Sequence, residues 1–248
     1  MGYVFDFQDA VAFEGWMRKP ENDAVFRAEM RLLCHLLRPR AGETILDIGC
    51  GTGMCLEAFV AMGLRATGIE PSEPMLEFAR RRVGRRAELH RGVAEELPFE
   101  DNAFHHACLF TTLEFVDDPR RALAEACRVA KDRVFIGVLN RYAIKGLERR
   151  IRGLFAPSIY NHARFFSLWQ VKTMLRELVG PVPITWRSVC QLPIPAGRFA
   201  PRFENPLLAR CPFGAFVGVV AVLMPRVRTR PLALRCPQGA QTPGAVPG

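Results

Sequence analysis

The segment Ile45–Gly53 constrains the fold of this 248-residue chain more than any other stretch. Its apolar start is followed by Gly49, Gly51 and Gly53, and a run with the apolar spacing of a helix comes next. Glycine permits the positive φ angles of a tight turn and allows a ligand to approach the backbone closely. The first N–H groups of a helix have no intrahelical partner and attract an anionic group. The segment is therefore typical of a strand–turn–helix unit that binds a nucleotide-like ligand.

An acidic residue after the next apolar run narrows the choice of ligand. The run 66–69 ends at Glu70, and a carboxylate in this position can accept hydrogen bonds from both ribose hydroxyls of an adenosine group. Dinucleotide sites use the pattern G-x-G-x-x-G, whereas this chain has Met54 in the place of the third glycine. The pattern favours an adenosine ligand other than NAD or a flavin. A dinucleotide oxidoreductase and a degenerate site stay open as alternatives.

Four motifs follow one another along roughly residues 41–140, each on the expected element. They are Asp47–Gly53, Gly68–Ser72, Gly92–Phe99 and Leu113–Pro119. Together they resemble the motifs of class I S-adenosylmethionine-dependent methyltransferases, most closely the type 11, ubiquinone/menaquinone-methyltransferase-like group. The resemblance implies an enzyme with S-adenosyl-L-methionine as its cofactor. It also implies an α/β fold: a Rossmann-like, doubly wound, seven-stranded sheet, mostly parallel, with an antiparallel C-terminal hairpin and helices on both faces.

The alternation of strand-like and helix-like segments independently predicts a parallel sheet with helices on both faces. Helices are expected to begin near Thr52 and after the N-caps Ser72 and Asp118. Ser167 opens a capping-box pattern whose helix should end at Gly180. Strands are expected at 44–48, 66–70, 88–91, 106–110, 133–139, 182–191 and 216–224.

The chain divides into three parts. Residues 1–40 are expected to form an N-terminal helical lid segment, in which an aromatic lead, 3–16, precedes a helix capped by Asn22 or Asp23. Core packing is the alternative role for that lead. Residues 41–225 form the methyltransferase domain, with 140–166 as an insertion on the substrate side. Residues 226–248 contain four prolines and no acidic residue, which predicts a disordered basic tail.

The resemblance assigns eleven residues to the cofactor. The glycine turn and the aspartate before it would hold the methionine part, Glu70 the ribose, and the following loops the adenine and the sulfonium. These residues are Asp47, Gly49, Cys50, Gly51, Glu70, Pro71, Met75, Ala94, Glu95, Phe110 and Thr111.

Two positions depart from the family pattern. Val93 stands where relatives often have an aspartate that accepts a hydrogen bond from the adenine amino group, and Phe115 stands where they often have histidine. We expect Glu95 or a backbone carbonyl to replace the aspartate. The loss of one such bond costs about 1 kcal/mol, so binding should survive.

No catalytic residue can be assigned from the sequence. A sulfonium carries an already activated methyl group, so positioning supplies much of the rate acceleration, and a base is needed only when the acceptor must lose a proton. Glu114, Tyr142, Tyr160 and His162 are weak candidates for that base, and each has a structural alternative. The expected reaction is methyl transfer to a small or medium-sized acceptor, for which the aromatic segments favour an apolar one.

Composition restricts the remaining classes of function. The net charge of +9 suggests RNA, but the arginines are scattered and no nucleic-acid-binding module is visible. Arginines 80–86 come late in a helix, where the macrodipole favours cations, and are expected to be solvated. An RNA or protein methyltransferase, or a non-catalytic protein that binds an adenosyl ligand, stays as the alternative. The cluster 149–152 leaves peripheral membrane contact open, and the oligomeric state cannot be deduced.

The cysteines and the absence of an export signal bear on metal binding and location. The eight cysteines show no Cys-x-x-Cys spacing, so no metal site is expected. The chain begins with no secretory signal, and its longest apolar run is too short to span a bilayer. We therefore expect a cytoplasmic protein with reduced thiols.

Overall fold

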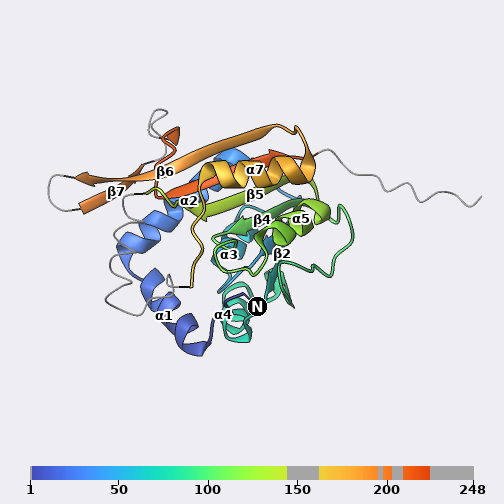
Figure 1. The fold of residues 1–248 in the computed structure, drawn as a ribbon. Helices are drawn as coiled ribbons and strands as arrows, with labels where there is room; N and C mark the ends of the chain where they lie inside the picture. The colour runs from blue at the N-terminus through green and yellow to red at the C-terminus, as the bar shows by residue number, and fades with distance from the viewer. Residues whose placement is uncertain (1, 144–161, 195–197, 203–208, 224–248) are drawn as a thin grey trace, which may run out of the picture.

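The computed structural model describes residues 2–143, 162–194, 198–202 and 209–223 (Figure 1). Its centre is a single sheet with the strand order β3-β2-β1-β4-β5-β8-β6-β7. The strands are β1 (Thr44–Ile48), β2 (Arg65–Glu70), β3 (Glu88–Arg91), β4 (Phe104–Phe110), β5 (Ala130–Leu139), β6 (Ile184–Ile194), β7 (Arg198–Arg202) and β8 (Phe216–Val222).

The direction of the strands confirms the predicted fold class. Strands β1 to β5 pair in parallel, whereas β8 is antiparallel to both β5 and β6. The seven expected strands are present, and β7 extends the sheet beyond them by pairing with the end of β6. The chain order reverses between β1 and β4, and ligands of open α/β sheets bind at the carboxyl ends of the strands at such a switch point.

Helices cover both faces of this sheet (Figure 1). On one face α5 and α7 pack against β4, β5 and β8, and on the other α2 and α3 pack against the sheet. Helix α1 lies against α2 and α4. The helices are α1 (Phe7–Met17), α2 (Pro20–Leu37), α3 (Met54–Ala61), α4 (Glu73–Val83), a 3₁₀ turn (Gly84–Arg86), α5 (Pro119–Val129) and α7 (Leu168–Val179).

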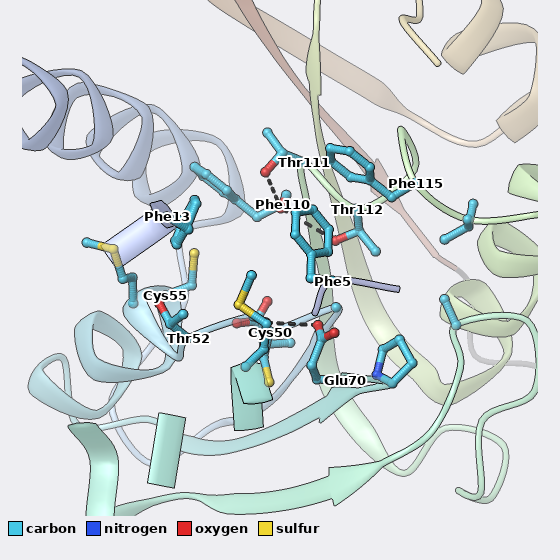
Figure 2. A pocket seen from close by; sticks show the side chains of 18 of the residues that line it. Phe5, Phe13, Cys50, Thr52, Cys55, Glu70, Phe110, Thr111, Thr112 and Phe115 are labelled. Atoms are coloured by element: carbon cyan, nitrogen blue, oxygen red, sulfur yellow. Dashed lines mark hydrogen bonds between the residues drawn. The ribbon is translucent and has the colours of Figure 1, made fainter. Parts of the chain in front are cut away.

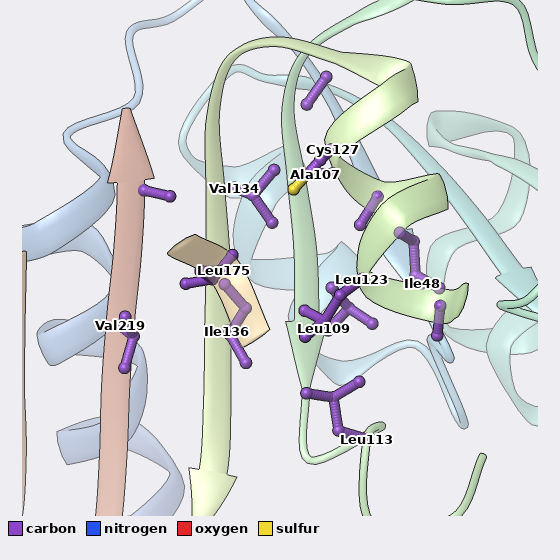
Figure 3. Close-up of a cluster of buried hydrophobic side chains, with 14 of the residues drawn as sticks. Ile48, Ala107, Leu109, Leu113, Leu123, Cys127, Val134, Ile136, Leu175 and Val219 are labelled. Carbon is purple, nitrogen blue, oxygen red and sulfur yellow. The ribbon is translucent and has the colours of Figure 1, made fainter. Parts of the chain in front are cut away.

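Two apolar clusters form the core, one on each face of the sheet. Figure 3 shows the first, in which Ile48, Leu109 and Ile136 from three neighbouring strands pack against Leu123 of α5 and Leu175 of α7. All five side chains are fully buried. The central parts of these strands are buried on both faces, which explains why stretches such as 107–110 and 134–139 are continuous apolar runs instead of alternating ones.

The local signals located the elements well except near the N-terminus. Ser72, Asp118 and Ser167 cap α4, α5 and α7 with hydrogen bonds to the backbone, as predicted. The prediction that Asn22 or Asp23 caps the next helix is wrong, because α2 begins at Pro20, whose fixed φ suits the first helical turn. Strands β4 and β5 also begin two and three residues before their expected starts.

Candidate active site

A cavity of about 690 Å³ opens at the carboxyl ends of β1, β2 and β4. Its size lies within the range of about 300–1,000 Å³ that is usual for small-ligand sites. All eleven residues that the resemblance assigns to the cofactor line it, although they come from three strands, the loops after the first four strands and helix α4. Figure 2 shows the glycine turn and Glu70 on one side, with a group of aromatic rings on the other.

The glycine turn after β1 has a conformation that only glycine adopts without strain. Gly49 and Gly51 have φ angles of 72° and 52°. A Cβ atom at position 49 would lie 2.4 Å from Cγ2 of Thr112, whose hydroxyl donates to the carbonyl of Ile48 at 2.7 Å. The N–H of Gly49 donates to the carbonyl of Ile69 at 2.8 Å, which ties the turn to β2. The turn is thus fixed, and its backbone lines the cavity.

Glu70 joins this turn to the start of α4. One carboxylate oxygen accepts the N–H of Gly51 at 3.0 Å, and the other accepts the N–H of Ser72 at 3.1 Å. Burial raises the pKa of Glu70, and the two backbone hydrogen bonds oppose that shift. A carboxylate oxygen has two lone pairs, so each oxygen retains the capacity to accept one more donor from the cavity.

Asp47 is a buried carboxyl group without a hydrogen-bond partner among the described residues. It is 1% exposed, it lines the cavity, and neither of its oxygens is satisfied. Burial, and then the charge of Glu70, raises the pKa of Asp47 to about 8. An unsatisfied buried group normally indicates a missing partner. The charge of a carboxylate here matches a cationic ligand group.

The remaining predicted cofactor residues on the β2 and β4 sides also face the cavity. Met75 lies in the first turn of α4, where its N–H donates to Oγ of Ser72 at 3.2 Å. Thr111 follows β4 with a φ of 53°, which is rare for a β-branched residue. Its N–H donates to the carbonyl of Gly137 at 2.8 Å and holds it there. Backbone strain of this kind clusters at functional sites.

Glu95 has a structural contact that the sequence did not predict. One oxygen of its carboxylate accepts the N–H groups of Asp117 and Asp118 at 2.8 and 3.2 Å, directly before α5. Val93, where the resemblance predicts an aspartate, also lines the cavity. The side chain of Glu95 therefore orders the loop after β4 as well as facing the cavity.

Aromatic side chains form the other half of the cavity (Figure 2). Phe5 and Phe115 meet edge to face at 5.0 Å, and Phe26 meets Phe110 in the same way at 5.9 Å. The N-terminal lead reaches this wall because the N–H of Tyr3 donates to the carbonyl of Phe115 at 2.9 Å. Two residues further along the lead, Oγ of Ser72 donates to the carbonyl of Phe5 at 2.6 Å.

The three weak candidates for a base that the structure describes do not line the cavity. Glu114 is buried, and its Oε1 accepts the N–H of Leu139 at 2.6 Å while burial raises its pKa to about 8. Tyr142 is exposed and meets the ring of Trp169. His162 stacks on Tyr3 with the ring centres 4.3 Å apart. Tyr160 lies outside the described residues.

The sequence predicts a lid segment at residues 1–40, but outside the aromatic lead it does not identify which residues of the N-terminal helices line the cavity. From α2, Asn22, Val25, Phe26 and Glu29 face the cavity, and from α1 the residues Phe13, Trp16 and Met17 do so. The apolar positions of α2 have helical spacing, which is equally typical of plain core packing. That signal could not show that one end of the helix faces a cavity.

Among the described residues, no group of His, Cys, Asp and Glu side chains has the arrangement of a metal site. A search of the same residues finds no helix that combines the length and the apolar character needed to cross a bilayer.

Comparison with known proteins gives a consistent result. A family model described as "Methyltransferase domain" matches residues 46–136. An uncharacterized protein of Methanocaldococcus jannaschii is 31% identical over 180 residues, which cover 71% of this chain and 80% of that protein. A ubiquinone biosynthesis O-methyltransferase of Thiobacillus denitrificans is 32% identical over 154 residues, which cover 56% of this chain and 65% of that enzyme.

Solved structures show the same similarity. A methyltransferase of Thermotoga maritima that depends on S-adenosylmethionine, described as a possible histamine N-methyltransferase, superimposes with a TM-score of 0.68 at 27% identity. The match covers 87% of this chain and 96% of that protein.

Proposed function

Because this chain belongs to the class I S-adenosylmethionine-dependent methyltransferases, we propose that it methylates a small or medium-sized, largely apolar acceptor in the aromatic half of its cavity. The observation that carries the proposal is the division of one cavity into two halves. Glu70 and the glycine turn, which are assigned to the cofactor, lie on one side of the cavity (Figure 2). Aromatic side chains from the lead, α1 and α2 lie on the other, where Phe110 meets Phe26.

The cofactor half fits S-adenosylmethionine in three respects. The backbone of Gly51 is open to a ligand, because nothing lies within 4 Å of the place of a Cβ there, and the free N–H groups at the start of α3 suit the methionine carboxylate. Asp47 offers an unsatisfied carboxyl group to the ammonium of the same moiety. The spare lone pairs of Glu70 suit the ribose hydroxyls. The bound cofactor supplies an activated methyl group, and the protein has to place the acceptor in line with it.

The acceptor half favours an apolar or planar group. Phe13, Trp16 and Phe26 present rings to the cavity, and such walls bind apolar surface while they exclude water. Glu29 is the only titratable residue that α2 contributes to this lining. We therefore assign Glu29, in preference to Glu114, Tyr142 or His162, as the residue that would take a proton from the acceptor when one is released.

The experiment begins with binding. Isothermal titration of the purified protein should show S-adenosylmethionine and S-adenosylhomocysteine binding with micromolar dissociation constants, and NAD not binding. Binding of NAD without a response to either adenosyl compound would contradict the assignment of the cofactor half.

A turnover screen then tests the acceptor class. Phenols, quinols and arylalkylamines are incubated with S-adenosylmethionine, and the formation of S-adenosylhomocysteine is followed by mass spectrometry. We include phenols and amines because a ubiquinone-pathway O-methyltransferase and a possible histamine N-methyltransferase are among the similar proteins. Turnover with RNA or protein but with none of the small acceptors would favour the alternative function. Binding without turnover of any acceptor would favour a non-catalytic protein.

A further inference from the structure

Arg82 is not the solvated end of α4 that the sequence predicts. Its Nη1 donates to the carbonyl and the hydroxyl of Thr52 at 2.8 and 2.9 Å. Its Nη2 donates to both carboxylate oxygens of Glu14, each at 2.9 Å. The side chains of Arg82 and Glu14 are only 19% and 12% exposed. By contrast, the neighbouring Arg81 is 70% exposed and pairs with Glu77 one turn away on the same helix.

Nε of Arg82 also pairs with the exposed Glu57 of α3 at 3.7 Å. The two partners of its Nη atoms belong to opposite halves of the cavity. Thr52 lies within the glycine turn, lines the cavity and is 1% exposed. Glu14 is buried on α1, directly after Phe13 and shortly before Trp16, and both of those rings line the aromatic half. One guanidinium group therefore joins the turn that receives the cofactor to the helix that encloses the acceptor.

The other hydrogen bonds that connect α1 to α2 and α4 lie near the two ends of α1. The carbonyl of Phe5, which precedes the helix, accepts from Ser72, and the carbonyl of Trp16 accepts from the side-chain amide of Asn22 at 2.8 Å. Glu14 lies between these two points. The planar guanidinium satisfies a carboxylate and a loop carbonyl at once, which a lysine cannot do with the same geometry.

We propose that Arg82 is a positioning residue that couples the glycine turn to helix α1, so that cofactor binding closes the aromatic wall over the acceptor site. The inference rests on the proposed function, because it assumes that the glycine turn holds the cofactor. A ligand on the turn further stabilises the position of Thr52, and Arg82, which contacts Thr52 and Glu14 together, stabilises the closed position of α1 in turn. Coupling between two sites is reciprocal. The factor by which the bound cofactor favours the closed position of α1 is therefore also the factor by which closure of α1 strengthens cofactor binding.

Hydrogen–deuterium exchange with S-adenosylhomocysteine as the probe tests this coupling. In the wild type we expect the probe to slow the exchange of the α1 amides, 7–17, by about fivefold or more, the lower end of typical coupling. In Arg82→Ala the probe should still bind, with a dissociation constant raised by about fivefold or more, but it should no longer slow exchange in α1. Arg82→Lys should restore only part of the effect, and Arg81→Ala should behave like the wild type.

A second variant keeps the test decisive if Arg82→Ala folds poorly. Glu14→Gln leaves the contact between Arg82 and Thr52 in place and weakens only the contact with α1. It should reduce the protection of α1 by the probe while the protein keeps its melting temperature.

Three results would overturn the inference. Full protection of α1 by the probe in both variants would show that Arg82 does not transmit closure, and would leave the proposed function intact. Faster exchange in α1 by the same factor with and without the probe would show a purely structural role. Absence of binding to the wild type would overturn the cofactor assignment as well.

Discussion

Replacing Asp47 by asparagine separates the cost of a buried charge from its use in binding. Both oxygens of Asp47 lack partners among the described residues, and burial raises its pKa to about 8. In the unfolded chain an aspartate has a pKa of about 3.9. The folded protein without ligand therefore takes up a proton that the unfolded chain releases, at every pH between about 4 and about 8.

The sign and the size of the effect follow from proton linkage. The folded state binds more protons, so this group stabilises the fold fully below pH of about 4, and that contribution is lost as the pH rises to about 8. A shift of about four units at 1.36 kcal/mol each corresponds to roughly 5 kcal/mol, as an order of magnitude. Asparagine stays neutral throughout. We expect Asp47→Asn to lie within about 1 kcal/mol of the wild type near pH 4.5, where little of the contribution is lost, and to be several kcal/mol more stable at pH 8.5.

Urea unfolding of the ligand-free protein at pH 4.5, 6.5 and 8.5 measures this difference. Burial also raises the pKa of Glu70 and Glu114, but both are present in the two proteins, so the difference between the proteins reports Asp47 together with its interaction with Glu70. Glu96→Gln is the matched control, because the Glu96 side chain is 82% exposed. Asp47→Asn should also bind S-adenosylmethionine about 1.5–3 kcal/mol less tightly than the wild type, the usual value of a hydrogen bond to a charged group. An identical pH dependence in Asp47→Asn and the wild type would refute the reasoning.

Three further substitutions test the division of the cavity. Gly49→Ala should lower stability by about 1–3 kcal/mol and abolish binding of S-adenosylhomocysteine. The reasons are that a Cβ at this position collides with Thr112 and that alanine disfavours the positive φ of Gly49. An unchanged melting temperature and affinity would contradict this prediction. Glu70→Gln should weaken the same binding by about 1.5–3 kcal/mol in titration, and an unchanged affinity would place the ribose elsewhere. Trp16→Ala should raise the KM for the acceptor with little change in cofactor affinity. Its control is Tyr142→Ala, which removes an exposed ring outside the cavity lining and should change neither quantity. Equal effects in the two variants would argue against the aromatic half as the acceptor site.

The sequence by itself determined the elements whose signals are local. The helix caps at Ser72, Asp118 and Ser167 depend on one side chain and the next few N–H groups, so they can be recognised without knowledge of the fold. The cofactor half was predictable for a related reason. Its residues follow strands directly, and parallel strands bring their carboxyl ends to one edge of the sheet. All eleven predicted residues line the cavity, although their contact with the cofactor is still a prediction.

Only the tertiary structure decided which side chains meet across the cavity. Arg82 and Glu14 are 68 residues apart, and an arginine cluster at a helix end has the same local pattern whether it is solvated or paired. Glu114 resembled a candidate base in its motif, but it does not line the cavity and its carboxylate accepts the N–H of Leu139. Helix α1 was missed because its aromatic residues lie on several sides of the helix instead of forming one apolar stripe. Local periodicity records the preference of a segment for a conformation, whereas burial, partners and pKa depend on the segments that pack against it.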